Sequence, residues 1–226
     1  MRRLIRYILP TTILIIFIIW TILVKTVDVH YINGIGFLGF YNFNTQVNNH
    51  IIEFARTNEF SKITDVLMYL SFIVALVFVA IGVIELIKRK SLRKVDPIIY
   101  LVGAAYIAIA IEYFIFELAK VNFSPLSTPE ELKASYPSSH VLIFNSVMGV
   151  GVITLFHYFK VNKILKLVTY ISLVILLLSY PVARLYSGHH YFSDIIGGVL
   201  LSAFIITLFN SIRVDLLNKK EENIKE

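Results

Sequence analysis

The chain has 226 residues, 57% of them hydrophobic, and its mean hydropathy of +0.75 lies far above that of soluble proteins. These values exclude an ordinary soluble domain and predict one all-α domain over residues 1–226 that crosses a membrane several times. The formal net charge of +6 does not call for nucleic acid as a partner, because the basic residues gather between apolar segments, where membrane topology explains them. The chain has no cysteine, which excludes disulfides.

Six apolar segments are each long enough to cross about 30 Å of hydrocarbon. They cover residues 4–24, 63–87, 97–119, 141–159, 167–185 and 192–212. The first follows a basic start, and no small-residue cleavage site comes after it, so we interpret it as an uncleaved span rather than a signal peptide. A polar tail is expected from Arg213 onward. The sequence therefore predicts a six-span transmembrane helical bundle.

The connection 25–61 between the first two spans is polar and aromatic. Turns are expected at Asn33-Gly34 and at residues 36–39. From Asn44 to Phe60 the sequence is amphipathic, which is typical either of a short extracytoplasmic helix lying on the membrane surface or of an ordered connecting loop.

The distribution of Lys and Arg predicts the orientation of the bundle. With the spans alternating in direction, 15 of the 21 basic residues fall on the side that carries both termini and the loops 88–96 and 160–166. Basic residues are enriched on the cytoplasmic side of membrane proteins, so we expect both termini to be cytoplasmic and the protein to lie in a plasma membrane. The histidine-containing connections described next would then be extracytoplasmic.

The first of these histidine clusters, residues 136–140, opens the fourth span with the sequence YPSSH. A serine here can cap the free backbone amides of the helix and do nothing more. Alternatively, amides and hydroxyls at a helix N-terminus can bind a phosphate, with His140 beside them able to donate a proton.

The second cluster lies between the last two spans, within residues 181–198. His190 and Asp194 are four residues apart and would share one face of a helix, where a carboxylate contacting one imidazole nitrogen makes the other nucleophilic. Arg184 offers a planar guanidinium group suited to phosphate oxygens. A plain salt bridge between Arg184 and Asp194 is the structural alternative. Lys120, which ends the third span, can pair with Glu117 or contact the same anion.

These residues resemble the signatures of the phosphatidic acid phosphatase type 2 (lipid phosphate phosphatase) superfamily. Arg184, His190 and Asp194 have the spacing of its SRxxxxxHxxxD signature, residues 136–140 are similar to its PSGH signature, and Lys120 is similar to the lysine of its KxxxxxxRP signature. The order of the three along the chain is that of the family.

The resemblance implies a metal-independent hydrolase that needs no cofactor and acts on a lipid phosphate or diphosphate in the bilayer. His190 would attack phosphorus and form a phosphohistidine, Asp194 would orient its ring, and His140 would protonate the leaving group. The phosphate oxygens would be held by Arg184, Lys120, Ser138 and Ser139. Undecaprenyl diphosphate, phosphatidylglycerophosphate and phosphatidic acid are the candidate substrates that the family implies.

The chain departs from the family pattern at three positions. Ser127 stands where the first signature has arginine, so one cationic contact is missing unless Lys133 or Arg56 replaces it. Ser139 stands in place of glycine, and Ala183 in place of serine.

Four alternatives to a metal-independent phosphatase remain open. The protein could be a catalytically weak relative that binds phospholipid headgroups, a lipid phosphotransferase or a proton-coupled transporter. It could also bind a metal ion through His140, His189, His190 and Asp194.

Overall fold

The computed structural model describes residues 2–55, 59–159 and 161–225. Within them, six helices are long and apolar enough to cross a membrane. They are α1 (Arg2–Thr26), α3 (Glu59–Arg89), α4 (Pro97–Ala119), α5 (Ser139–Tyr158), α6 (Lys163–Tyr186) and α7 (Phe192–Lys225). The predicted all-α, six-span bundle is confirmed, and the protein is a multi-pass membrane protein.

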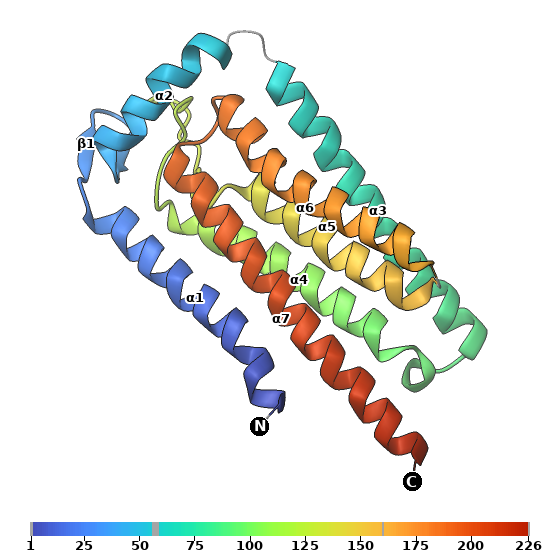
Figure 1. Cartoon of the computed structure of the whole chain (residues 1–226). Helices are drawn as coiled ribbons and strands as arrows, with labels where there is room; N and C mark the ends of the chain where they lie inside the picture. The colour runs from blue at the N-terminus through green and yellow to red at the C-terminus, as the bar shows by residue number, and fades with distance from the viewer. Residues whose placement is uncertain (1, 56–58, 160, 226) are drawn as a thin grey trace.

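The spans alternate in direction, so the connections between them collect at two ends (Figure 1). Both termini lie at one end, with the short 3₁₀ turn η1 (Leu92–Lys94) and the connection from α5 to α6. The other end carries residues 27–55, 120–138 and 187–191, and we call it the loop-rich end. Both histidine clusters therefore lie at the same end of the molecule.

Local capping groups explain where several helices begin and end. Pro97 occupies the first position of α4, and Asp96 Oδ1 accepts a hydrogen bond of 2.9 Å from the backbone N–H of Ile98. Asn162 caps α6 in the same way, accepting from the N–H of Leu165 at 2.7 Å. Just beyond the end of α6, Gly188 has a φ of 75°, a conformation that glycine adopts without steric cost. This glycine reverses the chain ahead of His190.

The helix α7 runs well past the predicted end of the last span. Its polar C-terminal part stays helical because it packs against the start of α1, where Arg6 Nη1 lies 3.1 Å from Asp215 Oδ1. Tyr7 donates a hydrogen bond of 2.9 Å to the other oxygen of Asp215. The predicted polar tail from Arg213 is thus a helix up to Lys225.

The helix α5 is the central helix of the bundle. Sixty-one per cent of its apolar span is buried, against 11–44% for the other five spans, and it packs on α3, α4, α6 and α7. Val141, Phe144 and Val150 are completely buried along it. Because α5 is held by four neighbours, the side chains of its first turn have a fixed position at the loop-rich end.

The connection after α1 contains a hairpin and a helix. Strands β1 (His30–Ile32) and β2 (Gly36–Leu38) pair antiparallel across the predicted turn at Asn33-Gly34, and α2 (Tyr41–Ala55) follows. A helix was one of the two alternatives predicted for this segment. It begins three residues before Asn44, and the predicted continuation at residues 56–58 lies outside the described residues. The strands were not predicted, since three residues are too few to show a period of two.

Gly39 provides a test of how this connection packs. A Cβ atom at position 39 would lie 1.6 Å from the carbonyl oxygen of Val24, so a side chain there forces the hairpin away from α1. We expect Gly39→Ala to destabilise the protein by about 1–3 kcal/mol, the usual cost of overpacking. Thermal unfolding in detergent measures the change.

Gly103→Ala is the matched control for that variant. A Cβ atom at position 103 meets no neighbouring atom within 4 Å, and alanine favours the helical conformation. Its melting temperature should equal or slightly exceed that of the unmodified protein. Equal destabilisation by both variants would show that the close approach at Gly39 is unimportant.

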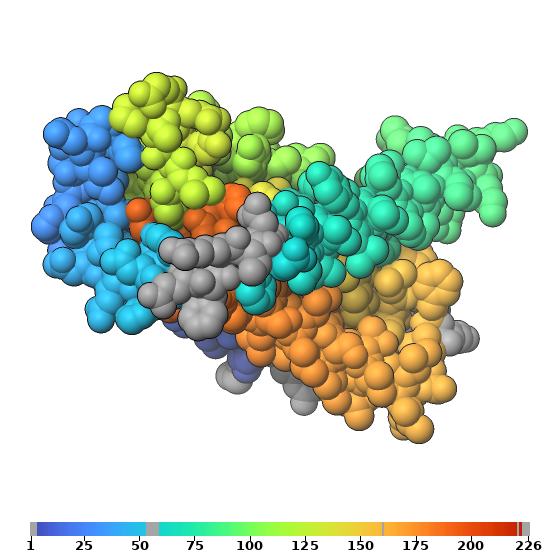
Figure 2. Space-filling model, turned by 90° about the horizontal axis from the view of Figure 1, so that it is seen from above, coloured from blue at the N-terminus to red at the C-terminus, as the bar shows by residue number. Residues whose placement is uncertain are grey.

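Figure 2 views the molecule from the loop-rich end. The blue hairpin and α2 and the yellow-green 120–138 loop lie around the orange residues at the turn between α6 and α7. The hydrogen bonds described below join these same segments. The turn that carries His190 is therefore enclosed by the connections from other parts of the chain.

Candidate active site

Three helix ends bring the two histidine clusters together. His140 lies in the first turn of α5, Arg184 in the last turn of α6, and His190 in the turn that leads into α7. The ring centroids of His140 and His190 are 6.4 Å apart. The two rings are therefore neighbours, close enough for both to contact one small ligand.

His190 is held by the backbone of the 120–138 loop. Its side chain is buried, and its Nδ1 lies 3.1 Å from the carbonyl oxygen of Ser135. Burial lowers the pKa of His190 well below its usual value, and the charges of Arg184 and His140 lower it further. The neutral ring therefore donates from Nδ1 to the carbonyl and keeps a free lone pair on Nε2, which is the form that a nucleophile requires.

The expected contact between Asp194 and the ring of His190 is replaced by other hydrogen bonds. Asp194 accepts from the backbone N–H of Tyr191 at 3.0 Å and from the side-chain amide of Asn122 at 3.0 Å. The hydroxyl of Ser193 lies 3.4 Å from the same carboxylate. The contact fails because His190 precedes the first residue of α7, so the two residues do not share a helical face. Asp194 holds the backbone beside His190 rather than its ring.

Asp194 belongs to a buried polar network that sequence reasoning missed. Asn44 donates to the hydroxyl of Ser193 at 2.9 Å and to the carbonyl of Gly39 at 2.7 Å. Asn122 also accepts from the N–H of Gly39 at 3.2 Å. Asn44 and Asn122 lie in two separate connecting segments, and no sequence pattern indicates that the two segments are neighbours in the fold. Through them the hairpin, α2 and the 120–138 loop fix the start of α7.

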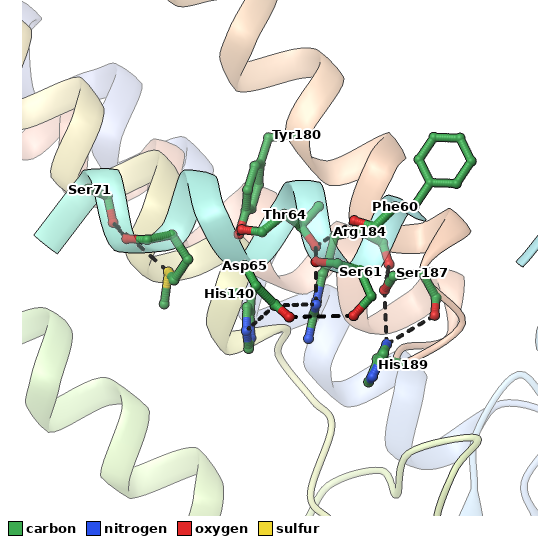
Figure 3. A network of polar contacts seen from close by, with 11 residues as sticks. Phe60, Ser61, Thr64, Asp65, Ser71, His140, Tyr180, Arg184, Ser187 and His189 are labelled. Atoms are coloured by element: carbon green, nitrogen blue, oxygen red, sulfur yellow. Dashed lines mark hydrogen bonds and ion pairs between the residues drawn. The ribbon is translucent and has the colours of Figure 1, made fainter. Parts of the chain in front are cut away.

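Arg184 is buried and is paired with α3 (Figure 3). Its Nη1 lies 3.2 Å from Asp65 Oδ1 and 3.2 Å from the hydroxyl of Thr64. The alternative of a salt bridge between Arg184 and Asp194 is thus wrong, because the acidic partner is Asp65. Only 5% of the Arg184 side chain is exposed, so its guanidinium group is fixed by its surroundings.

Asp65 was missed by the sequence analysis although the sequence carries a signal for it. It is the single acidic or basic side chain between Lys62 and Glu85, near the start of an apolar span. Ionisable groups inside membrane spans are costly and commonly functional. The same oxygen that binds Arg184 lies 3.5 Å from His140 Nε2.

Ser138 precedes α5, but its hydroxyl does not cap the helix. The side chain is completely buried and makes no capping hydrogen bond, while its backbone N–H donates to the carbonyl of Asp194 at 2.9 Å. The purely structural interpretation as an N-cap therefore does not hold for this serine. Its hydroxyl remains available to another partner.

Three buried polar atoms of these residues lack a hydrogen-bond partner within the described chain. They are Ser138 Oγ, His140 Nδ1 and Arg184 Nε. Buried polar atoms in proteins are nearly always paired, since leaving one unpaired costs about 1–3 kcal/mol. Two of these atoms belong to the residues that share the contact with Asp65, and Ser138 precedes His140 by two residues, which points to a place for a polar ligand near this contact.

The side chains of Ser139 and Lys120 make no hydrogen bond or ion pair with the group formed by Asp65, His140 and Arg184. Ser139 lines a small pocket beside α4 with Glu112, Glu117 and Tyr136. Lys120 follows the last residue of α4 with a φ of 44°, and its side chain is exposed, with no hydrogen bond or ion pair to the site residues that the structure describes.

Lys133 was one of the two predicted replacements for the missing arginine. It pairs with Glu131 at 3.2 Å. The pKa of His189 is lowered mainly by burial and by Arg184, and Lys133 adds a smaller effect in the same direction. Arg56, the other predicted replacement for the missing arginine, lies outside the described residues.

His189 contacts the turn to which it belongs. Its Nδ1 lies 3.0 Å from the carbonyl oxygen of Ser187. Within the described residues, no group of three or more His, Asp or Glu side chains has an arrangement able to hold a metal ion. The predicted metal-site alternative thus has no preformed ligand set in this part of the chain.

The chain is similar to known proteins in sequence and in fold. The model of the PAP2 superfamily matches residues 69–217, which is more than half of the chain. Among solved structures, the chain is similar to that described as the first transmembrane PAP2 type phosphatidylglycerolphosphate phosphatase from Bacillus subtilis, with 16% identity and a TM-score of 0.64 over 92% of this chain and 96% of that chain. No curated protein matches. On the evidence of the family model, the chain belongs to the PAP2 superfamily.

Proposed function

We propose that the protein is a membrane phosphatase that hydrolyses a lipid phosphate or diphosphate through a phosphohistidine intermediate. The observation that carries the proposal is the set of unpaired buried polar atoms on Ser138, His140 and Arg184, next to a neutral His190. A hydroxyl, an imidazole and a guanidinium group are together suited to a phosphoryl group. Membership of the PAP2 superfamily supports the same reaction.

In the proposed first step, His190 Nε2 attacks phosphorus. The bond from phosphorus to the leaving oxygen breaks, and His140 donates a proton to that oxygen. Arg184 and Ser138 hold the other phosphate oxygens, and the positive charge of Arg184 and the hydrogen bonds of both groups favour the transition state. Asp194 supports the step by fixing the backbone beside His190.

In the proposed second step, water attacks the phosphohistidine. His140 accepts a proton from the water, the bond between nitrogen and phosphorus breaks, and inorganic phosphate leaves. His190 returns to its neutral form. No metal ion or other cofactor takes part in this scheme.

Undecaprenyl diphosphate, phosphatidylglycerophosphate and phosphatidic acid are the proposed substrate classes. The similar Bacillus subtilis protein carries phosphatidylglycerolphosphate phosphatase in its description, which supports including the second of them. The excess of Lys and Arg at the end that carries the termini supports a plasma-membrane protein with cytoplasmic termini and an extracytoplasmic site. The whole chain is proposed to act as one membrane domain.

A second candidate is a catalytically weak relative that binds phospholipid headgroups. The missing arginine at Ser127 and the exposed side chain of Lys120 favour it, because Arg184 is then the only described arginine or lysine that contacts the site residues through an ion pair. This protein would bind a lipid phosphate without releasing phosphate.

The function is tested with purified protein in detergent micelles and a panel of the three lipid classes. We expect free phosphate to appear with at least one lipid, to persist with a strong chelator present, and to stop with vanadate. Binding without phosphate release supports the headgroup-binding alternative, and transfer of phosphate to another lipid indicates a phosphotransferase. Loss of activity with the chelator, restored by added metal, would overturn the metal-independent mechanism.

A further inference from the structure

One carboxylate oxygen bridges two groups that the proposed function assigns to the phosphate. Asp65 Oδ1 lies 3.2 Å from Arg184 Nη1 and 3.5 Å from His140 Nε2 (Figure 3). The other carboxylate oxygen lies 3.5 Å from the hydroxyl of Ser61. Asp65 thus reaches the site from α3, whereas the residues that it contacts belong to α5 and α6.

A carboxylate and a phosphate compete for such a position. Both are anions whose oxygens accept hydrogen bonds from a guanidinium group and from a protonated or N–H-bearing imidazole. Two anions held within a few ångströms of each other repel strongly in a partly desolvated site. A phosphoryl group that binds Arg184 Nη1 and His140 Nε2, the two atoms that Asp65 contacts, therefore displaces its carboxylate.

The three partners differ in how freely they can move. The Asp65 side chain is 43% exposed, whereas that of Arg184 is 5% exposed and that of His140 is 30% exposed. A partly exposed aspartate can reach solvent by a change of side-chain rotamer. Arg184 is confined by its surroundings and by its hydrogen bond to Thr64. Displacement therefore moves Asp65 and leaves the cation in place.

We propose that Asp65 is a specificity-determining residue, which occupies the phosphate position in the substrate-free protein and gives way only to a phosphoryl group that carries additional binding energy. This inference rests on the proposed function. A lipid phosphate gains that energy from its apolar chains in the bilayer, while inorganic phosphate has no such contribution. Asp65 thus weakens the binding of the product and favours its release. The position lies outside the matched family region, which begins at residue 69.

The test compares the binding of inorganic phosphate to the full-length protein and to Asp65→Asn, measured by titration calorimetry in detergent. Asparagine keeps the size of the side chain and removes its charge. We expect the dissociation constant for phosphate to fall by about tenfold or more, and phosphate to become a correspondingly stronger inhibitor of lipid hydrolysis. Asp65→Ser, which also removes the charge, should bind phosphate more tightly in the same way. Asp65→Glu retains the carboxylate, so its dissociation constant for phosphate should stay close to that of the unmodified protein.

Glu59→Gln is the matched control. Glu59 lies at the start of the same helix and is paired with exposed Lys62 at 3.1 Å, so its substitution removes one negative charge away from the site. It should leave phosphate binding unchanged. Equal tightening by Glu59→Gln would assign the effect to overall charge and overturn the proposal.

Two further outcomes separate this inference from the proposed function. Unchanged or weaker phosphate binding in both Asp65→Asn and Asp65→Ser, with lipid hydrolysis still present in the unmodified protein, overturns the role of Asp65 and leaves the phosphatase intact. Tighter phosphate binding in a protein that releases no phosphate from any lipid supports the role of Asp65 in an anion site and contradicts the phosphatase.

Discussion

Replacing His190 with alanine is expected to reduce phosphate release from the lipid substrate by about 10³-fold or more. The variant lacks the nitrogen that attacks phosphorus, and removing a nucleophile costs more than removing a group that only binds. The bundle should remain folded, because the ring makes one hydrogen bond, from Nδ1 to the carbonyl of Ser135. Initial rates at saturating lipid phosphate, with melting temperature as a folding check, measure the effect.

His189→Ala is the control for that experiment. His189 is the adjacent histidine, and its Nδ1 contacts Ser187 within the same turn, so it should retain most of the activity. Quenching the unmodified enzyme in alkaline detergent with a labelled substrate should trap a phosphoprotein that is stable in base and labile in acid, and that His190→Ala lacks. Equal activity of His190→Ala and the unmodified enzyme would rule out His190 as the nucleophile.

Replacing Arg184 with alanine is expected to lower the rate at low substrate concentration by about 10²–10³-fold, the usual range for removing a group that stabilises transition-state charge. The variant also leaves the carboxylate of Asp65 without its arginine partner. The negative charge of Asp65 then repels the phosphate and weakens its binding. Arg184→Lys should recover only part of the loss, because an ammonium group lacks the planar fork of guanidinium. The ratio kcat/KM for each variant measures the effect.

A double variant separates the two contributions to that loss. If part of the damage in Arg184→Ala comes from the uncompensated Asp65, adding Asp65→Asn should raise the rate above that of Arg184→Ala alone. The single variant Asp65→Asn completes the double-mutant cycle. Strict additivity of the two substitutions would mean that Arg184 and Asp65 act independently, which contradicts their shared contact.

The six spans could be predicted because a membrane span is recognised from the length and hydropathy of one continuous segment. Length and hydropathy determine whether about 20 residues can cross the bilayer, and neither depends on the rest of the fold. The short strands β1 and β2 and the helical continuation of α7 could not be predicted in this way. The continuation depends on Asp215 meeting Arg6, two residues at opposite ends of the chain.

The site was only partly predictable for a related reason. His140, Arg184 and His190 could be identified from local motifs, and the structure brings them together. Asp65 comes from a different span, and its contact with Arg184 depends on how α3 packs against α6. The partner of His190 is a backbone carbonyl, which every residue possesses, so no side-chain pattern could distinguish Ser135 from its neighbours.

Trp20, the single tryptophan of the chain, stacks on Phe40 at 5.3 Å and donates a hydrogen bond of 3.1 Å to the carbonyl oxygen of Ser193, next to Asp194. The indole is thus hydrogen-bonded to the backbone at the start of α7. Its ultraviolet emission therefore comes from one known location and reports on that location alone. A rearrangement of the start of α7 can therefore be followed optically in the unmodified protein, with no dye attached.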